Sequence, residues 1–277
     1  MSRSIFAEAS GSYSGDILEL AKNGLDALMP YKVINKNDLR QGYYIVRKSK
    51  VDHNVTSTFG DHSNEIGKSS IFFQEMAYKM HVFDTVQRIS LKDLMYGTTT
   101  EDEVKNNLEV GLMKDAYHSV IFGKKNINME GISTLKGRSK VTVETLTNGF
   151  TLYEKVALAK RESEKYKEKL DGVYHLLVPH TYAHLLLELY SEPQYVTVKD
   201  ALKRDHDILT MVFKGLKNPI LYEPNPEVMF VPMLPEIFFR KFASADGDYI
   251  HASMESAGII HFEPQEVVEI EVTKPSQ

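Results

Sequence analysis

Two histidines, His180 and His184, come closer than any other residues of this sequence to the spacing of a metal site. A separation of four would place both imidazoles on one face of the helix expected near Tyr182 to Tyr190, close enough to share an ion. A metalloprotease pattern would need a glutamate directly after His180, but Thr181 stands there and no third ligand is marked. We therefore interpret both residues as ordinary histidines at a helix start.

A second group combines two acids with an imidazole: Asp205, His206 and Asp207. Such a group has the chemistry to tune a general base. Neighbouring residues on a helix point in different directions, however, so we expect this group to lie on the surface. No serine occupies a nucleophile-elbow pattern either.

Gly67, Lys68 and Ser69 match the end of a phosphate-binding loop. The full pattern needs a glycine where His62 stands, and the nearest upstream glycine, Gly60, lies two positions too far away. The sequence therefore predicts no catalytic, cofactor-binding or metal-binding residue. We expect a protein that is not an enzyme.

The composition narrows the class of protein. The 277 residues are 42% hydrophobic and 26% charged, which is enough for one large domain or two modest ones. Cysteine is absent, which removes disulfides, thiolate nucleophiles and thiolate metal ligands. The net charge of -5, with both signs interspersed, argues against a dedicated nucleic-acid binder. No apolar run approaches the roughly 20 residues that span a bilayer, so we expect a soluble, non-secreted chain.

Three stretches have the periodicity of amphipathic helices. Residues 16–29 place apolar side chains at helical spacing, and Pro30 discourages the helix from continuing. A helix this short is marginal in water on its own, so it must dock on another surface. Residues 101–122 are the clearest case, with an acidic first turn, an apolar stripe and Gly123 as the stop signal. A further helix is expected over residues 150–170.

Residues 43–93 read as a long β-hairpin. Its arms are residues 43–55 and 70–91, and the middle, residues 57–69, is polar and contains glycine. A compact domain would not cover both faces of arms this long, so we expect them to lie over another subunit.

The chain from Val173 onward alternates between short strands and short helices, which is typical of an α+β protein. We expect helices near Tyr182 to Tyr190 and near Val198 to Phe213. The expected strands are residues 174–179, a segment near Ile220, residues 228–233, residues 237–242 and a closing strand within residues 267–272.

Three segments together resemble a known fold. Residues 101–135 combine a long helix that ends in Val-Ile-Phe-Gly with the pair Gly131 and Ile132. Residues 174–190 read as a strand followed by a helix, and residues 255–272 as a return strand with a proline-containing turn. In this order they resemble the Hong Kong 97-type capsid fold of tailed-phage major capsid proteins and bacterial encapsulins.

The resemblance implies an α+β subunit in four parts. These are an N-terminal arm at residues 1–42 and an extended loop at residues 43–93. A peripheral domain, with spine helix 101–122, would comprise residues 94–145 and 251–277, and an axial domain residues 146–250. It also implies a shell subunit that assembles into pentamers and hexamers of an icosahedral phage head enclosing double-stranded DNA. The implied partners are copies of itself and, as further candidates, scaffold, portal or decoration proteins, with DNA as non-specific content. No cofactor and no membrane are implied. The implied location is the virion capsid, assembled in the host cytoplasm.

Two alternatives stay open at this point. The first is an encapsulin-type nanocompartment shell, for which the segment from Asp16 to Met29 would serve as a cargo-docking helix instead of a capsid arm. The second is a soluble enzyme with an unrecognised site, for which the candidates are His180, His184, Asp205 and His206.

Overall fold

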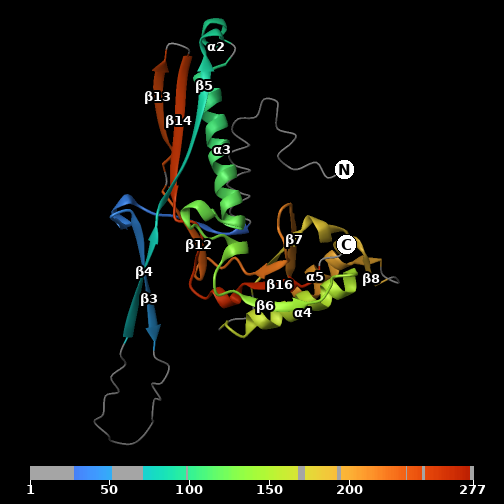
Figure 1. Ribbon diagram of the computed structural model, residues 1–277. Coiled ribbons are helices and arrows are strands. Elements are labelled where there is room, and N and C mark those ends of the chain that lie inside the picture. Colours follow the sequence, from blue (N-terminus) through green and yellow to red (C-terminus); the bar gives the residue numbers. More distant parts are fainter. Residues whose placement is uncertain are drawn as a thin grey trace, which may run out of the picture.

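The computed structural model describes residues 28–51, 71–97, 99–167, 172–191, 195–234, 236–244 and 247–274. They form an α+β structure, as the sequence predicts, with two large sheets and a projecting hairpin (Figure 1). The long sheet and its helix extend in one direction and the hairpin in the opposite one, while the second sheet lies to the side. Within these ranges no helix is both long and apolar enough to cross a membrane.

The long sheet is built on β14 (Gly247–Ser256). This strand pairs antiparallel with β5 (His81–Ser90) along one edge and with β13 (Phe238–Ser244) along the other. Beyond the end of β14 the sheet continues through β12 (Met229–Met233), which is flanked by β1 (Tyr31–Val33) and β15 (Ile260–His261). Because strand side chains alternate between two faces, Phe83, Ile89, Ile250, Ala252 and Met254 all lie on one buried face.

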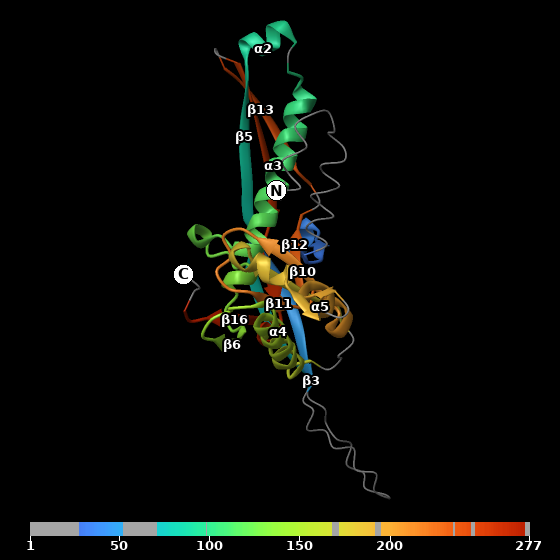
Figure 2. The same cartoon turned by 90° about the vertical axis from the view of Figure 1, so that its right-hand side faces the viewer.

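A single helix, α3 (Glu101–Phe122), covers that buried face (Figure 2). It begins at a capping box in which Thr100 Oγ1 accepts from the Glu103 amide at 3.2 Å and Glu103 Oε2 accepts from the Thr100 amide at 2.8 Å. It ends at Gly123, whose φ of +67° and close approach to Met129 O favour glycine. The predicted helix over residues 101–122 is confirmed, including its buried stripe.

The second sheet has the strand order β10 (Ile208–Phe213), β7 (Tyr174–Pro179), β11 (Ile220–Tyr222), β16 (Val268–Val272) and β6 (Ser139–Val143). Helices α4 (Gly149–Glu164) and α5 (Val198–His206) pack on it and close a separate apolar core. The helix predicted over residues 150–170 is therefore confirmed at its start but wrong at its end. Helix α4 ends at Glu164, and Lys165 and Tyr166 directly after it are exposed, so burial does not favour a further helical turn there.

Two helices predicted beyond Val173 are partly wrong. Residues near Tyr182 to Tyr190 form the 3-10 helix η4 (His180–Leu187), followed by β8 (Leu189–Ser191), which pairs with β9 (Val196–Thr197). The helix near Val198 to Phe213 ends at Asp207, whose φ is +53°, and the remaining residues become β10. Val212 and its apolar neighbours pair with the buried strand β7, and this tertiary pairing outweighs any local helical pattern.

The hairpin is formed by β3 (Tyr43–Val51) and β4 (Ile71–Lys79), with β2 (Leu39–Arg40) at its base. The predicted hairpin is thus confirmed over these two strands. The single second arm over residues 70–91 is wrong, because the chain breaks at the buried Met80 and β5 leaves the hairpin to pair with β14. Met80 packs with Tyr44 and Phe230 in a small core under the hairpin base.

Short elements connect these parts. They are α2 (Leu91–Tyr96), at the far end of the long sheet, and the 3-10 turns η1 (Lys36–Asp38), η2 (Lys125–Ile127), η3 (Ile132–Thr134) and η6 (Pro264–Glu266). Except for Leu28 and Met29, the helix predicted over residues 16–29 lies outside the described residues. The same holds for residues 57–69 and for the remainder of the first arm beyond Val51.

Candidate functional site

His180 and His184 lie on a helix whose geometry does not align them for metal binding. Both are exposed on η4, a 3-10 helix with about three residues per turn, so a spacing of four does not align them on one face. Across the part of the chain that the structure describes, no group of three His, Cys, Asp or Glu side chains is arranged to hold a metal ion. Gly67, Lys68 and Ser69 lie outside the described residues.

Asp205 and His206 do lie close to other polar side chains, but Asp205 is already engaged. Its carboxylate accepts from Tyr153 Oη at 3.0 Å and pairs with Arg204 at 2.7 Å. The hydrogen bond from Arg204, more than that from Tyr153, lowers the pKa of Asp205 against the opposing effect of burial. A carboxylate held ionised in this way is a poor proton acceptor at neutral pH.

His206 packs with its ring 5.3 Å from the ring of Tyr153, and burial, followed by the charge of Lys160, lowers its pKa. Asp207 is exposed at the end of α5 and does not complete a triad. The sequence-predicted surface group therefore makes an aromatic and hydrogen-bonded contact between α4 and α5.

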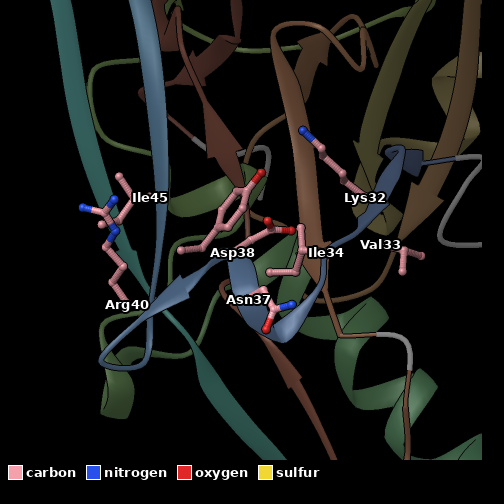
Figure 3. Close-up of a pocket in the computed structure, with 8 residues that line it drawn as sticks. Lys32, Val33, Ile34, Asn37, Asp38, Arg40 and Ile45 are labelled. Atoms are coloured by element: carbon pink, nitrogen blue, oxygen red, sulfur yellow. The ribbon is translucent and has the colours of Figure 1, made fainter.

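A pocket of about 400 Å³ lies between η1, β1 and β3. Figure 3 shows Lys32 and Arg40 at opposite ends of it, with Asp38 between them. Asp38 accepts from the Asn35 amide at 2.9 Å, and the Lys32 ammonium lies 5.2 Å from the centre of the Phe230 ring. The two cations do not converge on one position, so this pocket lacks the geometry of an anion or substrate site.

The outer face of the long sheet carries apolar side chains that no described element covers. On β5, Val82 and Val86 are each 59% exposed, and on β13, Phe242 is 54% exposed. Register places Val86 beside His251 and Arg240, so these side chains form one surface across β5, β14 and β13. We call this surface the outer sheet face; Phe238 also belongs to it.

Apolar side chains are exposed at two further ends of the molecule. At the far end of the long sheet, α2 exposes Met95 and Tyr96. At the outer end of the second sheet, the rings of Phe150 and Tyr190 stack with their centroids 6.2 Å apart. Three apolar or aromatic residues close to Tyr190 in the sequence are exposed: Leu187, Leu189 and Tyr195. Apolar surface gathered at several ends of one chain is typical of a protein that associates with others.

The hairpin projects from the rest of the described chain (Figure 1). Nine residue pairs from Tyr43↔Lys79 to Val51↔Ile71 form the ladder. Figure 1 shows these strands extending away from both sheets, and the described core contacts lie at the base, around Tyr44 and Met80. A two-stranded ribbon alone is marginally stable in water, so it needs a surface to lie on.

A polar network around Glu269 connects three strands of the second sheet. Glu269 on β16 accepts from Arg138 Nε at 2.9 Å and from Asn218 Nδ2 at 2.7 Å. Burial acts to raise the pKa of Glu269, but the hydrogen bonds from Asn218 and Arg138 outweigh it and lower the pKa. The network therefore holds an ionised carboxylate between β6, β11 and β16.

Comparison with known proteins identifies the fold. No family model and no curated protein sequence matches this chain, but solved structures do. The virus-like particle from Pyrococcus furiosus has a TM-score of 0.65 at 15% identity, over 94% of this chain and 100% of that one. The capsid of Myoviridae phage XM1 has a TM-score of 0.68 at 12% identity, over 87% of this chain and 89% of that one. The capsid of an empty GTA particle has a TM-score of 0.64 at 8% identity, over 98% and 94%.

These likenesses confirm the predicted fold class. The chain has the Hong Kong 97-type capsid fold, and the described hairpin precedes the long helix α3 as predicted. Sequence reasoning missed the outer sheet face. A signal for it existed in the alternation of Val82 and Val86 with Phe83, which places apolar residues on both faces of one strand.

Proposed function

We propose that this chain is a structural shell subunit, a major capsid protein that self-assembles into pentamers and hexamers of an icosahedral phage head around double-stranded DNA. The observation that carries the proposal is the hairpin β3–β4, a nine-pair ribbon that extends away from both sheets of the described chain (Figure 1). The capsid fold supports it, as do the apolar outer sheet face and the exposed ends. Each of these surfaces gains its missing burial on a neighbouring copy.

We infer a division into an N-terminal arm at residues 1–42, an extended loop at 43–93, a peripheral domain at 94–145 with 251–277, and an axial domain at 146–250. The helix α3 would be the spine of the peripheral domain. Strand pairing crosses these limits at several points. β1 of the arm pairs with β12 of the axial domain, β5 of the extended loop pairs with β14, and β16 of the peripheral domain pairs with β11 of the axial domain. Such crossed pairing would make the parts move as one body.

The proposal assigns the chain an architectural role without catalysis, in the virion capsid and assembled in the host cytoplasm. Its main partner would be itself. Scaffold, portal and decoration proteins are further candidate partners, and DNA would be non-specific content. The chain's mixed charges agree with a wall that encloses DNA without recognising its sequence.

A second candidate is a nanocompartment shell that encloses a cargo protein. It is favoured by one observation, that the likeness to the virus-like particle from Pyrococcus furiosus covers 100% of that chain. The content of purified particles distinguishes the two candidates. Nucleic acid that resists added nuclease would support the capsid. A second protein that stays with the particles through every wash would support the nanocompartment.

The test is to express the chain alone and examine it by sedimentation and negative-stain electron microscopy. Closed particles, tubes or rings of five or six copies support a shell protein. A uniform monomer, also after co-expression with candidate scaffold proteins, contradicts it. His184→Ala is the matched control for the enzyme alternative, since we expect it to assemble like the wild type.

Deleting residues 58–68 tests the role of the hairpin separately. We expect a folded subunit, because the described core contacts of the hairpin lie at its base, but weaker shells. Circular dichroism measures the folding and sedimentation measures the assembled fraction. An unfolded deletion variant would place these residues in the intramolecular core and contradict the role that we give the hairpin.

A further inference from the structure

His175 is a buried imidazole in the centre of the second sheet. It is 8% exposed, and its Nδ1 atom has no hydrogen-bond partner among the described residues. It lies on β7 between Leu209 of β10 and Tyr222 of β11, and its ring meets Tyr222 edge-on at 5.7 Å. Burial lowers the pKa of His175. A neutral imidazole tolerates such a site, whereas a protonated one donates from both nitrogens and needs two acceptors.

Tyr222 connects this histidine to the first described residues of the chain. The Tyr222 hydroxyl donates to Leu28 O at 2.8 Å, and Tyr222, Leu28 and Met29 are all fully buried. Directly after them, Pro30 O accepts from the Val231 amide and the Ile34 amide donates to Met233 O, both at 3.0 Å. We call residues 28–34 the root of the N-terminal segment, since residues 1–27 precede it.

We propose that His175 is an acid-sensitive latch on this root: neutral His175 keeps the contact between Tyr222 and Leu28 closed, and protonation of His175 opens it. In the closed state, a proton on Nδ1 would point into an apolar site. Opening at Tyr222 admits water to that nitrogen and at the same time removes the hydrogen bond that holds Leu28 O. The latch would let acid release residues 28–34 while the rest of the described chain stays folded, and it does not depend on the proposed shell function.

Among the described residues, the groups around His175 offer no compensation for its positive charge. From β11 the facing titratable group is Tyr222, and from α3 Tyr117 lies near enough to raise the pKa of Tyr222 further. Burial raises the pKa of both tyrosines, so both stay neutral. From β10, the neighbour is the aliphatic Leu209. Because the pKa of folded His175 lies below its ordinary value of 6.5, the closed state is favoured above pH 6.5 and loses stability as pH falls below it.

Amide hydrogen exchange on the full-length chain tests the latch. The amides of Ile34 and Val231 report on the root, and the amide of Leu152, bonded to Asn148 O at 3.2 Å, reports on the other core. Between pH 7.5 and 5.5 we expect the protection factors of Ile34 and Val231 to fall, by at most about ten-fold, which is the limit set by one pH unit below the ordinary histidine pKa of 6.5. Protection at Leu152 should change less than about two-fold, because opening is local.

Four variants complete the test. His175→Phe keeps a ring against Tyr222 but cannot titrate, so the acid response of Ile34 and Val231 should disappear; His175→Asn, smaller and also non-titrating, serves if the Phe variant does not fold. Tyr222→Phe should lower protection at both pH values, since the bond to Leu28 O is lost. His206→Gln, at the other histidine with an unpartnered buried nitrogen, is the control and should retain the wild-type profile.

Two results would overturn the latch. One is an acid response that persists in both His175 variants or is absent from the wild type. The other is an equal loss of protection at Leu152, which would mean global unfolding in place of local release.

Discussion

At the scale of single residues, Leu112 decides whether α3 can pack. It is 1% exposed in the core shared by α3 and the long sheet. Leu112→Asp would bury a carboxylate among apolar side chains and cost about 4 kcal/mol or more, which we expect to prevent folding. Recovery in the soluble fraction and circular dichroism measure this. Gly111→Asp adds the same charge one residue earlier, where a Cβ meets nothing within 4 Å, and should fold. Soluble, assembled Leu112→Asp would show that this helix face is exposed.

The Arg138 and Glu269 pair provides a second residue-scale prediction. Arg138→Ala leaves the Glu269 carboxylate nearly buried without its cation, so we expect a loss of about 3 kcal/mol in the free energy of unfolding. Lys140→Ala is the matched control, since Lys140 also joins β6 to β16, at 2.8 Å from Glu271, but in solvent. It should change stability little. Denaturant titration at pH 7 measures both variants, and equal effects would contradict the argument.

The same pair has a predictable pH dependence. Because the pKa of Glu269 in the folded chain lies below its ordinary value of 4.5, its contribution is complete well above pH 4.5 and is lost as pH falls through the folded pKa. In Arg138→Ala this part of the acid destabilisation should be smaller, because Asn218 alone still donates to the Glu269 carboxylate. Unfolding midpoints at pH 3 and pH 7 for both proteins provide the comparison.

At the scale of elements, the two faces of β5 should respond oppositely to a lysine. Phe83→Lys enters the core against α3 and should prevent folding. Val86→Lys and Phe242→Lys lie on the outer sheet face, so the melting temperature should change by less than about 3 °C. If that face contacts a neighbouring copy, a lysine there would be buried and unpaired in the interface. The critical concentration for assembly then rises roughly ten-fold for each 1.4 kcal/mol of association free energy that is lost. Wild-type assembly of the Val86→Lys, Phe242→Lys double variant would exclude this face from the interface.

Helices and strands were predictable from the sequence where capping residues and the pattern of apolar residues agreed with the side chains that are buried in the fold. The helix over residues 101–122 has a capping box, an apolar stripe and a terminal glycine, and the structure confirms both limits. The break at Met80 was not predictable, because both halves of the arm have strand-forming residues and only tertiary pairing assigns them to different sheets. The end of α5 at Asp207 depends likewise on β10 pairing with β7.

At the scale of the whole molecule, the candidate site is a set of surfaces, and the sequence predicted only part of it. The sequence predicted that the hairpin must lie on another subunit, because the pattern of residues shows how long its arms are. The outer sheet face did not follow, because exposure of Val86 and Phe242 depends on which face α3 covers. The histidines failed as a site for a local reason: the 3-10 geometry of η4 removes the alignment that their spacing implied.

The branched shape gives the last prediction. A compact chain of 277 residues would have a radius of gyration of about 19 Å. The long sheet and the hairpin extend in opposite directions from the second sheet (Figure 1), so the unassembled subunit should exceed that value clearly. Two contacts within the chain stabilise the extended long sheet: the full-length pairing of β5 with β14, and the packing of α3 against them. Neither contact depends on a neighbouring copy. Small-angle scattering on the Val86→Lys, Phe242→Lys double variant, kept below its assembly concentration, measures this. A value near 19 Å would mean that the isolated subunit folds its extensions back and acquires its shape only on assembly.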